Sequence, residues 1–62
     1  MKVKVKNKIY QFNIKLKAKE LLRKLNLQSQ SSIVVRNGEV ITEDEYIQPE
    51  DEVEIIDAIS GG

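Results

Sequence analysis

The sequence predicts an α+β domain with a mixed four- to five-stranded sheet and one main helix. Three features predict it: alternating lysine and valine at the N-terminus, a leucine stripe at helical spacing, and short β-branched runs in the second half. One helix with a single apolar stripe covers one face of such a sheet. The 62 residues leave room for one domain with a small core, because a chain of this length buries only about 60% of its unfolded surface.

The first element is expected to be a hairpin. Lysine and valine alternate over residues 2–6, so the valines point inward and the lysines outward. We expect the turn at Asn7-Lys8, because asparagine tolerates the left-handed conformation of two-residue hairpin turns. Ile9 is out of phase with the next strand and is expected on its outer face. The inward set of that strand is Tyr10, Phe12, Ile14 and Leu16.

A helix of about three turns is predicted next. Its apolar stripe consists of Ala18, Leu21, Leu22 and Leu25, spaced i, i+3, i+4 and i+7. Charged residues occupy the opposite face, where Glu20 and Lys24 stand four residues apart in the favourable order for an ion pair.

The second half of the chain contains three short apolar runs. Ile33-Val34-Val35 is expected to be a strand buried on both faces. Asn37-Gly38 is the strongest hairpin signal in the chain, and Val40-Ile41 returns from it. Residues 42–51 are acidic and loop-like, and Pro49 argues against a central strand there.

The last strand is predicted over residues 52–57, where Val53, Ile55 and Asp57 alternate with Glu52, Glu54 and Ile56. The element order is then strand, strand, helix, strand, short strand, strand. We interpret this order as a β-grasp (ubiquitin-like) fold. The single domain is expected to span residues 1–59, with residues 60–62 as a flexible C-terminal tail.

Composition argues against several function classes. The chain has no Cys, His or Trp, so disulfides, a thiolate nucleophile, a zinc site and histidine acid–base catalysis are not expected. We therefore predict no enzyme activity, no bound metal and no bound cofactor. With few aromatics in its basic half and zero net charge, the chain is not expected to bind nucleic acid. No apolar run approaches ~18 residues and no signal core follows Met1, so we expect a cytoplasmic protein without a membrane segment.

The charges are separated along the chain. All ten Lys and Arg lie between Lys2 and Arg36, whereas every acid except Glu20 lies between Glu39 and Asp57. The separation has two interpretations: ordinary surface solubility, or an acidic face beside the C-terminus that steers a basic partner.

The chain resembles the ThiS/MoaD group of ubiquitin-like sulfur carriers over essentially its whole length. Three segments carry the resemblance: Leu21-Leu22-x-x-Leu25, Val34-Val35-Arg36-Asn37-Gly38-Glu39-Val40, and Asp51-Glu52-Val53-Glu54-Ile55-Ile56 followed by Ser60-Gly61-Gly62. One departure is Glu50 before Asp51, where the family usually has Gly-Asp. A turn that needs positive φ would place strain on Glu50.

The resemblance implies that the working group is the Gly62 carboxylate. A ThiF/MoeB-type, E1-like adenylyltransferase would use ATP and Mg²⁺ to adenylate Gly62, and a sulfur donor would convert it to a thiocarboxylate. Ser60 and Gly61 would be recognised as the tail, since residues without bulky side chains can thread a narrow channel. Catalytic residues and the metal would belong to the partner.

The ending resembles the thiamine-thiazole carrier more than the molybdopterin carrier, because no proline stands between Asp51 and Gly62. The acceptor would then be a thiazole synthase. The alternatives are sulfur donation to molybdopterin, a protein modifier joined to lysines through Gly62, and a β-grasp binding module with an inert tail.

Three smaller expectations concern the surface. Tyr46 and Ile47 are expected to pin the acidic loop to the core rather than to form a partner-facing patch. Glu43-Asp44-Glu45 is expected to be solvated rather than a metal site. The free protein is expected to be a monomer, because no surplus apolar stripe remains once the helix and strands are packed.

Overall fold

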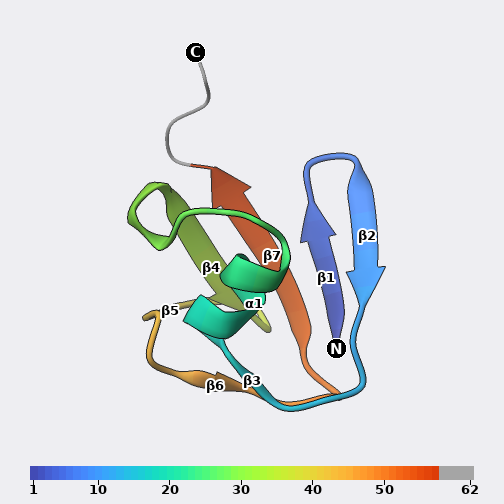
Figure 1. The fold of residues 1–62 in the computed structure, drawn as a ribbon. Coiled ribbons are helices and arrows are strands. Elements are labelled where there is room, and N and C mark those ends of the chain that lie inside the picture. The colour runs from blue at the N-terminus through green and yellow to red at the C-terminus, as the bar shows by residue number, and fades with distance from the viewer. Residues whose placement is uncertain (58–62) are drawn as a thin grey trace.

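The computed structural model describes residues 1–57 as one layer of sheet with a helix packed across it (Figure 1). Residues 58–62 lie outside the described part. The strands are β1 (Lys2–Val5), β2 (Lys8–Gln11), β3 (Leu16–Lys17), β4 (Ser32–Arg36), β5 (Glu39–Ile41), β6 (Tyr46–Ile47) and β7 (Glu52–Asp57). The helices are α1 (Ala18–Lys24) and a short 3₁₀ helix, η1 (Ser29–Ser31).

The main sheet has five strands in the order β2-β1-β7-β4-β5. β1 runs parallel to β7, and the other neighbours are antiparallel, so the sheet is mixed as predicted. A second, two-stranded sheet joins β3 to β6. This small sheet was not predicted, because strands of two residues are too short to show a period.

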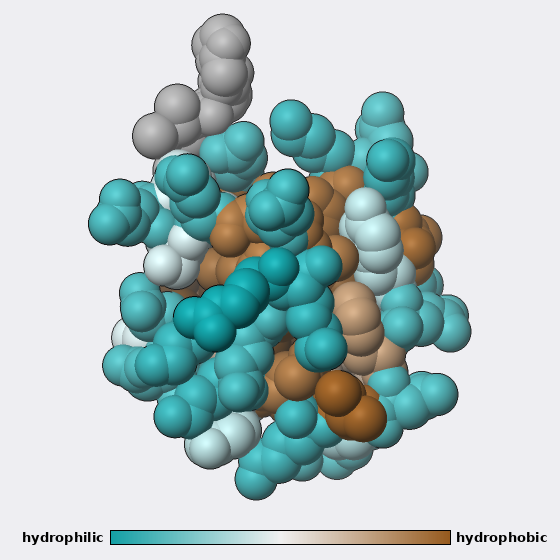
Figure 2. Space-filling view, in the orientation of Figure 1, coloured by the Kyte–Doolittle hydropathy of each residue, from teal (hydrophilic) through white to brown (hydrophobic). Residues whose placement is uncertain are grey.

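The core lies between α1 and one face of the main sheet. Ala18, Leu21 and Leu22 of the predicted stripe are buried, and Leu25 packs partly buried at its end. The sheet and its connections supply the remaining buried apolar residues: Met1, Val3, Leu16, Val34, Ile41, Ile47, Val53 and Ile55. On the side shown in Figure 2, hydrophilic residues surround a central area of hydrophobic ones.

The helix is seven residues long, shorter than predicted, because Asn26 ends it. Asn26 has a φ of 61° and its N–H donates to the carbonyl of Arg23 at 3.0 Å. The N–H of Leu27 donates to the carbonyl of Leu22 at 2.8 Å. Together these two bonds form a Schellman motif with asparagine in the left-handed position.

The first turn of α1 is closed by a side chain that was expected elsewhere. Glu20 Oε1 accepts a hydrogen bond from the backbone N–H of Lys17 at 2.9 Å. The predicted ion pair between Glu20 and Lys24 is not among the ion pairs of residues 1–57. Glu20 therefore stabilises the start of the helix rather than its side.

The first hairpin turns one residue earlier than predicted. Val5 pairs with Lys8, so the two turn residues are Lys6 and Asn7. Lys6 takes the left-handed conformation, with a φ of 54°. The strand register, set by the inward valines, decides the turn position here, and the preference of asparagine does not.

Two predicted burial assignments are wrong. Ile14 is 51% exposed, because the chain leaves the main sheet after Gln11 and only rejoins a strand at β3. Ile33 is 39% exposed, because the sheet is covered by a helix on one face only. The expected exposure of Ile9 is confirmed.

Candidate functional site

The proposed working residues Ser60, Gly61 and Gly62 lie outside the described residues, so the site is built from the strand that leads to them. That strand, β7, is central in the sheet. It pairs with β1 from Lys2↔Glu52 to Val5↔Ile55, and with β4 from Ser32↔Asp57 to Arg36↔Val53. Ladders on both sides hold β7 as far as Ile55, and the β4 ladder alone continues to Asp57, the last residue of the strand.

The two faces of β7 differ in chemistry. Val53 and Ile55 point into the core and are 4% exposed each. The alternate residues Glu52, Glu54 and Ile56 point to the face that α1 does not cover, which we call the open face.

Four apolar side chains form a patch on the open face. Cross-strand partners share a face, and the register pairs Ile33 with Ile56 and Val35 with Val40. Val40 is 71% exposed, Ile56 45% and Ile33 39%, while Val35 is half-buried. We call these four residues the open-face patch. Ile56 is the penultimate residue of β7, so the patch lies at the end of the strand that leads to Gly62.

Sequence reasoning missed this patch, and its prediction that no surplus apolar stripe remains was wrong. The signal was present: isoleucine and valine occupy the outward phase of three predicted strands. With one helix available, only one face of the sheet can be covered. The predicted monomeric state stays a prediction, although its stated reason does not hold.

Beside the patch, lysines and glutamates of β1 and β7 are neighbours on the open face. Lys2 stands opposite Glu52, and Lys4 opposite Glu54, because β1 and β7 are parallel neighbours. A shallow depression lies between these side chains and the Asn37-Gly38 turn. On this part of the surface, lysines of the basic half of the chain thus lie beside glutamates of the acidic half.

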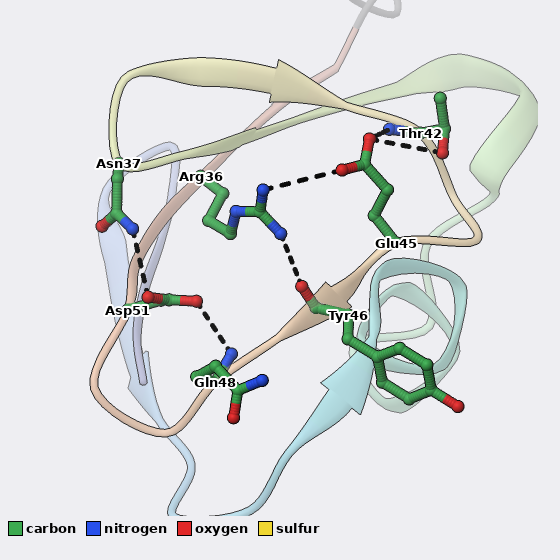
Figure 3. A network of polar contacts seen from close by, with 7 residues as sticks. All are labelled: Arg36, Asn37, Thr42, Glu45, Tyr46, Gln48 and Asp51. Carbon is green, nitrogen blue, oxygen red and sulfur yellow. Dashed lines mark hydrogen bonds and ion pairs between the residues drawn. The ribbon is translucent and has the colours of Figure 1, made fainter.

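A network of polar contacts holds the acidic loop to β4 (Figure 3). Arg36 donates a hydrogen bond to the carbonyl of Tyr46 at 2.6 Å and lies 3.6 Å from Glu45 Oε1. The N–H of Thr42 donates to Glu45 Oε2 at 3.0 Å. The ammonium of Lys19 lies 3.4 Å from Asp44. Two of the three adjacent acids thus have structural partners.

Tyr46 and Ile47 have different roles. Ile47 is fully buried and pins the loop to the core, as predicted. Tyr46 stays 48% exposed, and its ring lies 4.5 Å from the ammonium of Lys15 and 5.4 Å from that of Lys17. These cation–π contacts account for the exposed ring within the fold.

Asn37 and Asp51 connect the second hairpin to the start of β7. Asn37 Nδ2 donates to Asp51 Oδ1 at 3.1 Å, and the N–H of Glu52 donates to Asn37 Oδ1 at 3.0 Å. The backbone N–H of Gln48 and the Asn37 side chain lower the pKa of Asp51 below its ordinary value. Glu50 is not among the left-handed residues, so its replacement of the family glycine causes no backbone strain.

Within residues 1–57, no three His, Cys, Asp or Glu side chains are grouped to hold a metal ion. In the same residues, no helix is long and apolar enough to cross a membrane. Among the described residues, the open-face patch lies beside the end of the strand that leads to the C-terminal glycines.

Comparison with known proteins identifies the family. The family model named ThiS matches residues 3–62. The chain belongs to the ThiS family. The match includes Ser60, Gly61 and Gly62, so the tail is part of the family pattern. The β-grasp prediction is confirmed as well, since the fold matches that of a ThiS structure.

A solved structure agrees over the whole length of both chains. It is the crystal structure of the thiamine biosynthesis protein ThiS from Geobacter metallireducens. The two chains are 28% identical, and the TM-score is 0.68 with 100% of each chain covered. ThiS proteins are small sulfur carriers, so membership in the family supports that role for this chain rather than the role of an enzyme.

Proposed function

We propose that this protein carries sulfur for thiamine biosynthesis as a thiocarboxylate on Gly62. An E1-like adenylyltransferase uses ATP and Mg²⁺ to form an acyl-adenylate at the Gly62 carboxylate. A sulfur donor then displaces AMP, and the resulting thiocarboxylate passes sulfur to a thiazole synthase. The observation that carries this proposal is the family match, which reaches through residue 62.

The arrangement of β7 supports the proposal. A carrier must present its terminus in a fixed direction, and β7 is held on both sides up to Ile55 and by β4 up to Asp57. Gly62 is six residues beyond Ile56, so an extended tail reaches at most about 20 Å from the open-face patch. For a partner seated on the patch, the active site must therefore lie within this distance if Gly62 is to enter it.

The open-face patch is the surface proposed to dock the activating enzyme. The patch combines exposed isoleucine and valine with flanking lysine and glutamate pairs. This mixture of an apolar centre and a charged rim is typical of specific interfaces. The partner surface should be apolar at its centre, because it must cover the exposed isoleucine and valine side chains of the patch.

Adenylation provides the test of this function. The activating enzyme is incubated with ATP, Mg²⁺, labelled pyrophosphate and the carrier, and label exchange into ATP is measured. The native chain should support exchange, whereas a chain with one extra residue after Gly62 should not, although its thermal unfolding is unchanged. Equal exchange with both chains would contradict a role for the Gly62 carboxylate.

The protein-modifier alternative shares the adenylation step, so another experiment separates the two. A blot against this protein in host cells would show a ladder of heavier species if Gly62 were joined to lysines of other proteins. The carrier proposal predicts no ladder that depends on Gly62. The molybdopterin alternative differs in the acceptor of the sulfur. Incubating the thiocarboxylate with a thiazole synthase and with a molybdopterin synthase shows which enzyme accepts it.

A further inference from the structure

The Asn37-Gly38 turn combines a reactive sequence with a restrained side chain. Both residues are exposed and left-handed, with φ values of 51° and 87°. Both ends of the Asn37 carboxamide are engaged: Nδ2 donates to Asp51 Oδ1 at 3.1 Å, and Oδ1 accepts from the Glu52 N–H at 3.0 Å. The backbone N–H of Asn37 also donates to the Glu52 carbonyl at 2.8 Å.

An asparagine followed by glycine can lose ammonia without an enzyme. The backbone nitrogen of Gly38 attacks Cγ of Asn37, forming a C–N bond in a five-membered succinimide. The bond from Cγ to the side-chain nitrogen breaks, and ammonia leaves with the proton of the Gly38 amide. Water then opens the ring at either carbonyl, giving aspartate or isoaspartate. Gly38 offers little steric hindrance, because glycine carries no Cβ beside the attacking nitrogen.

We propose that Asn37 is a deamidation site, and that its hydrogen bonds to Asp51 and Glu52 slow the deamidation in the folded protein. The carboxamide cannot turn its Cγ toward the Gly38 nitrogen without leaving both hydrogen-bond partners. Reactions of this kind depend steeply on the approach of the two reacting atoms. The folded state therefore slows the attack, and any opening of the Asn37–Asp51 contact releases it.

Deamidation at this position would in turn damage the contact that prevents it. Asp51 is anionic at neutral pH, because its pKa is lowered by its contacts with Gln48 and Asn37. An aspartate at position 37 would lose the donor and place a second carboxylate about 3 Å from the first, an unfavourable pairing. Isoaspartate would also add a backbone atom to a two-residue turn, so the Arg36↔Glu39 register could not be kept.

The consequence reaches β7. Asn37 forms hydrogen bonds to Glu52 through both its side chain and its backbone N–H. Glu52 is the first residue of β7, the strand that leads toward Gly62. Deamidation therefore loosens the start of the central strand. The inference is independent of sulfur transfer, since it rests on the hairpin and on Asp51 alone.

Ageing experiments on the native chain and D51A test the proposal. Each is kept at mildly alkaline pH, folded or in concentrated urea, and the mass gain from replacing NH₂ by OH is followed and located by fragmentation. In buffer, D51A should deamidate at Asn37 at least about tenfold faster than the native chain. In urea the two should react at equal rates, and Asn37 should react before Asn7, Asn13 and Asn26, which precede larger residues.

If D51A folds poorly, the deamidation rates of the native chain in buffer and in urea still test the proposal. Asn37 of the native chain should react much more slowly folded than in urea. Equal rates in the two states, or equal rates for folded native chain and folded D51A, would overturn the proposal.

The product is tested with N37D and N37G, which both lose the amide, while only N37D adds a charge. At neutral pH N37D should unfold at a lower urea concentration than N37G, and the gap should narrow in acid. If N37D were the more stable of the two at neutral pH, the repulsion from Asp51 would be refuted.

Discussion

The two faces of the five-stranded sheet are built from the same strands but serve different purposes. The covered face presents Val3, Val34, Val53 and Ile55 to α1, and all are nearly fully buried. The open face presents the alternate residues of the same strands, which include neighbouring lysines and glutamates as well as the open-face patch. Because side chains alternate along a strand, one sequence encodes both faces at once.

The comparison separates the residues that stabilise the fold from those that are proposed to bind a partner. An apolar side chain on the covered face is removed from water within the chain itself. An apolar side chain at Ile33, Val40 or Ile56 remains partly in water and adds little to folding. Such a side chain is fully buried only when another protein, here the proposed activating enzyme, covers it. Substitutions on the two faces should therefore affect different measurements.

The largest effect on stability is expected on the covered face. Leu22→Ala removes a side chain that is 2% exposed, and should lower the free energy of unfolding by about 2–5 kcal/mol. Val40→Ala on the open face, where Val40 is 71% exposed, should change it by less than about 0.5 kcal/mol. Urea unfolding monitored by circular dichroism measures both. Equal losses would mean that the two faces are not distinct.

The reverse ordering is expected for recognition. The double variant I33T/I56T keeps β-branched side chains but removes the apolar centre of the patch. It should lower kcat/KM of the activating enzyme for the carrier by at least about tenfold. The matched control is I9T/I14T, which changes two isoleucines that are 57% and 51% exposed outside the patch. If the control lost as much activity as the patch variant, the docking surface would be assigned wrongly.

Arg36, at the border of the covered face, tests how much its contacts with the acidic loop add to stability. R36M keeps much of the apolar stem but removes the hydrogen bond to the Tyr46 carbonyl and the contact with Glu45. The expected loss of unfolding free energy is about 1 kcal/mol, since the contact is partly exposed. Thermal unfolding measures it. A loss as large as that of Leu22→Ala would show that the acidic loop belongs to the core.

The smallest effect is expected at Asp51, through pH. Its pKa is lower in the folded state than in the unfolded state, so its ionised form stabilises the fold above pH 4. This contribution is lost as the pH falls from about 4 through the folded value. Stability of the native chain should therefore fall more steeply below about pH 4 than that of D51N.

The control for Asp51 is E50Q, which removes one carboxylate from the same turn. Urea midpoints measured across this pH range compare the three proteins. If the urea midpoint of D51N fell with pH as steeply as that of the native chain, Asp51 would not be the group responsible.

Periodicity predicted most of the fold. The phase of Val3, Leu21, Leu22, Val53 and Ile55 was enough to assign the inward residues, because burial of one face imposes it. The Asn37-Gly38 turn was also found, since both residues take the left-handed conformation that its sequence favours.

Other features required the tertiary structure. The left-handed residue of the first hairpin is Lys6, although Asn7 has the better intrinsic preference, because pairing between β1 and β2 fixes the turn. The bond from Asn37 to Asp51 joins residues 14 positions apart, and no local pattern indicates it. The sequence shows the outward isoleucines and valines one strand at a time, but they form one patch only because β7, β4 and β5 are neighbours in the sheet.

The central claim is that sulfur is carried on Gly62. The most direct measurement is the intact mass of the protein after incubation with ATP, Mg²⁺, a sulfide source and the activating enzyme, followed by fragmentation. If Gly62 carries the sulfur, one oxygen of its carboxylate is replaced by sulfur, and the fragmentation locates the mass change at Gly62. An unchanged mass, under conditions in which the same enzyme converts a known carrier, would contradict it.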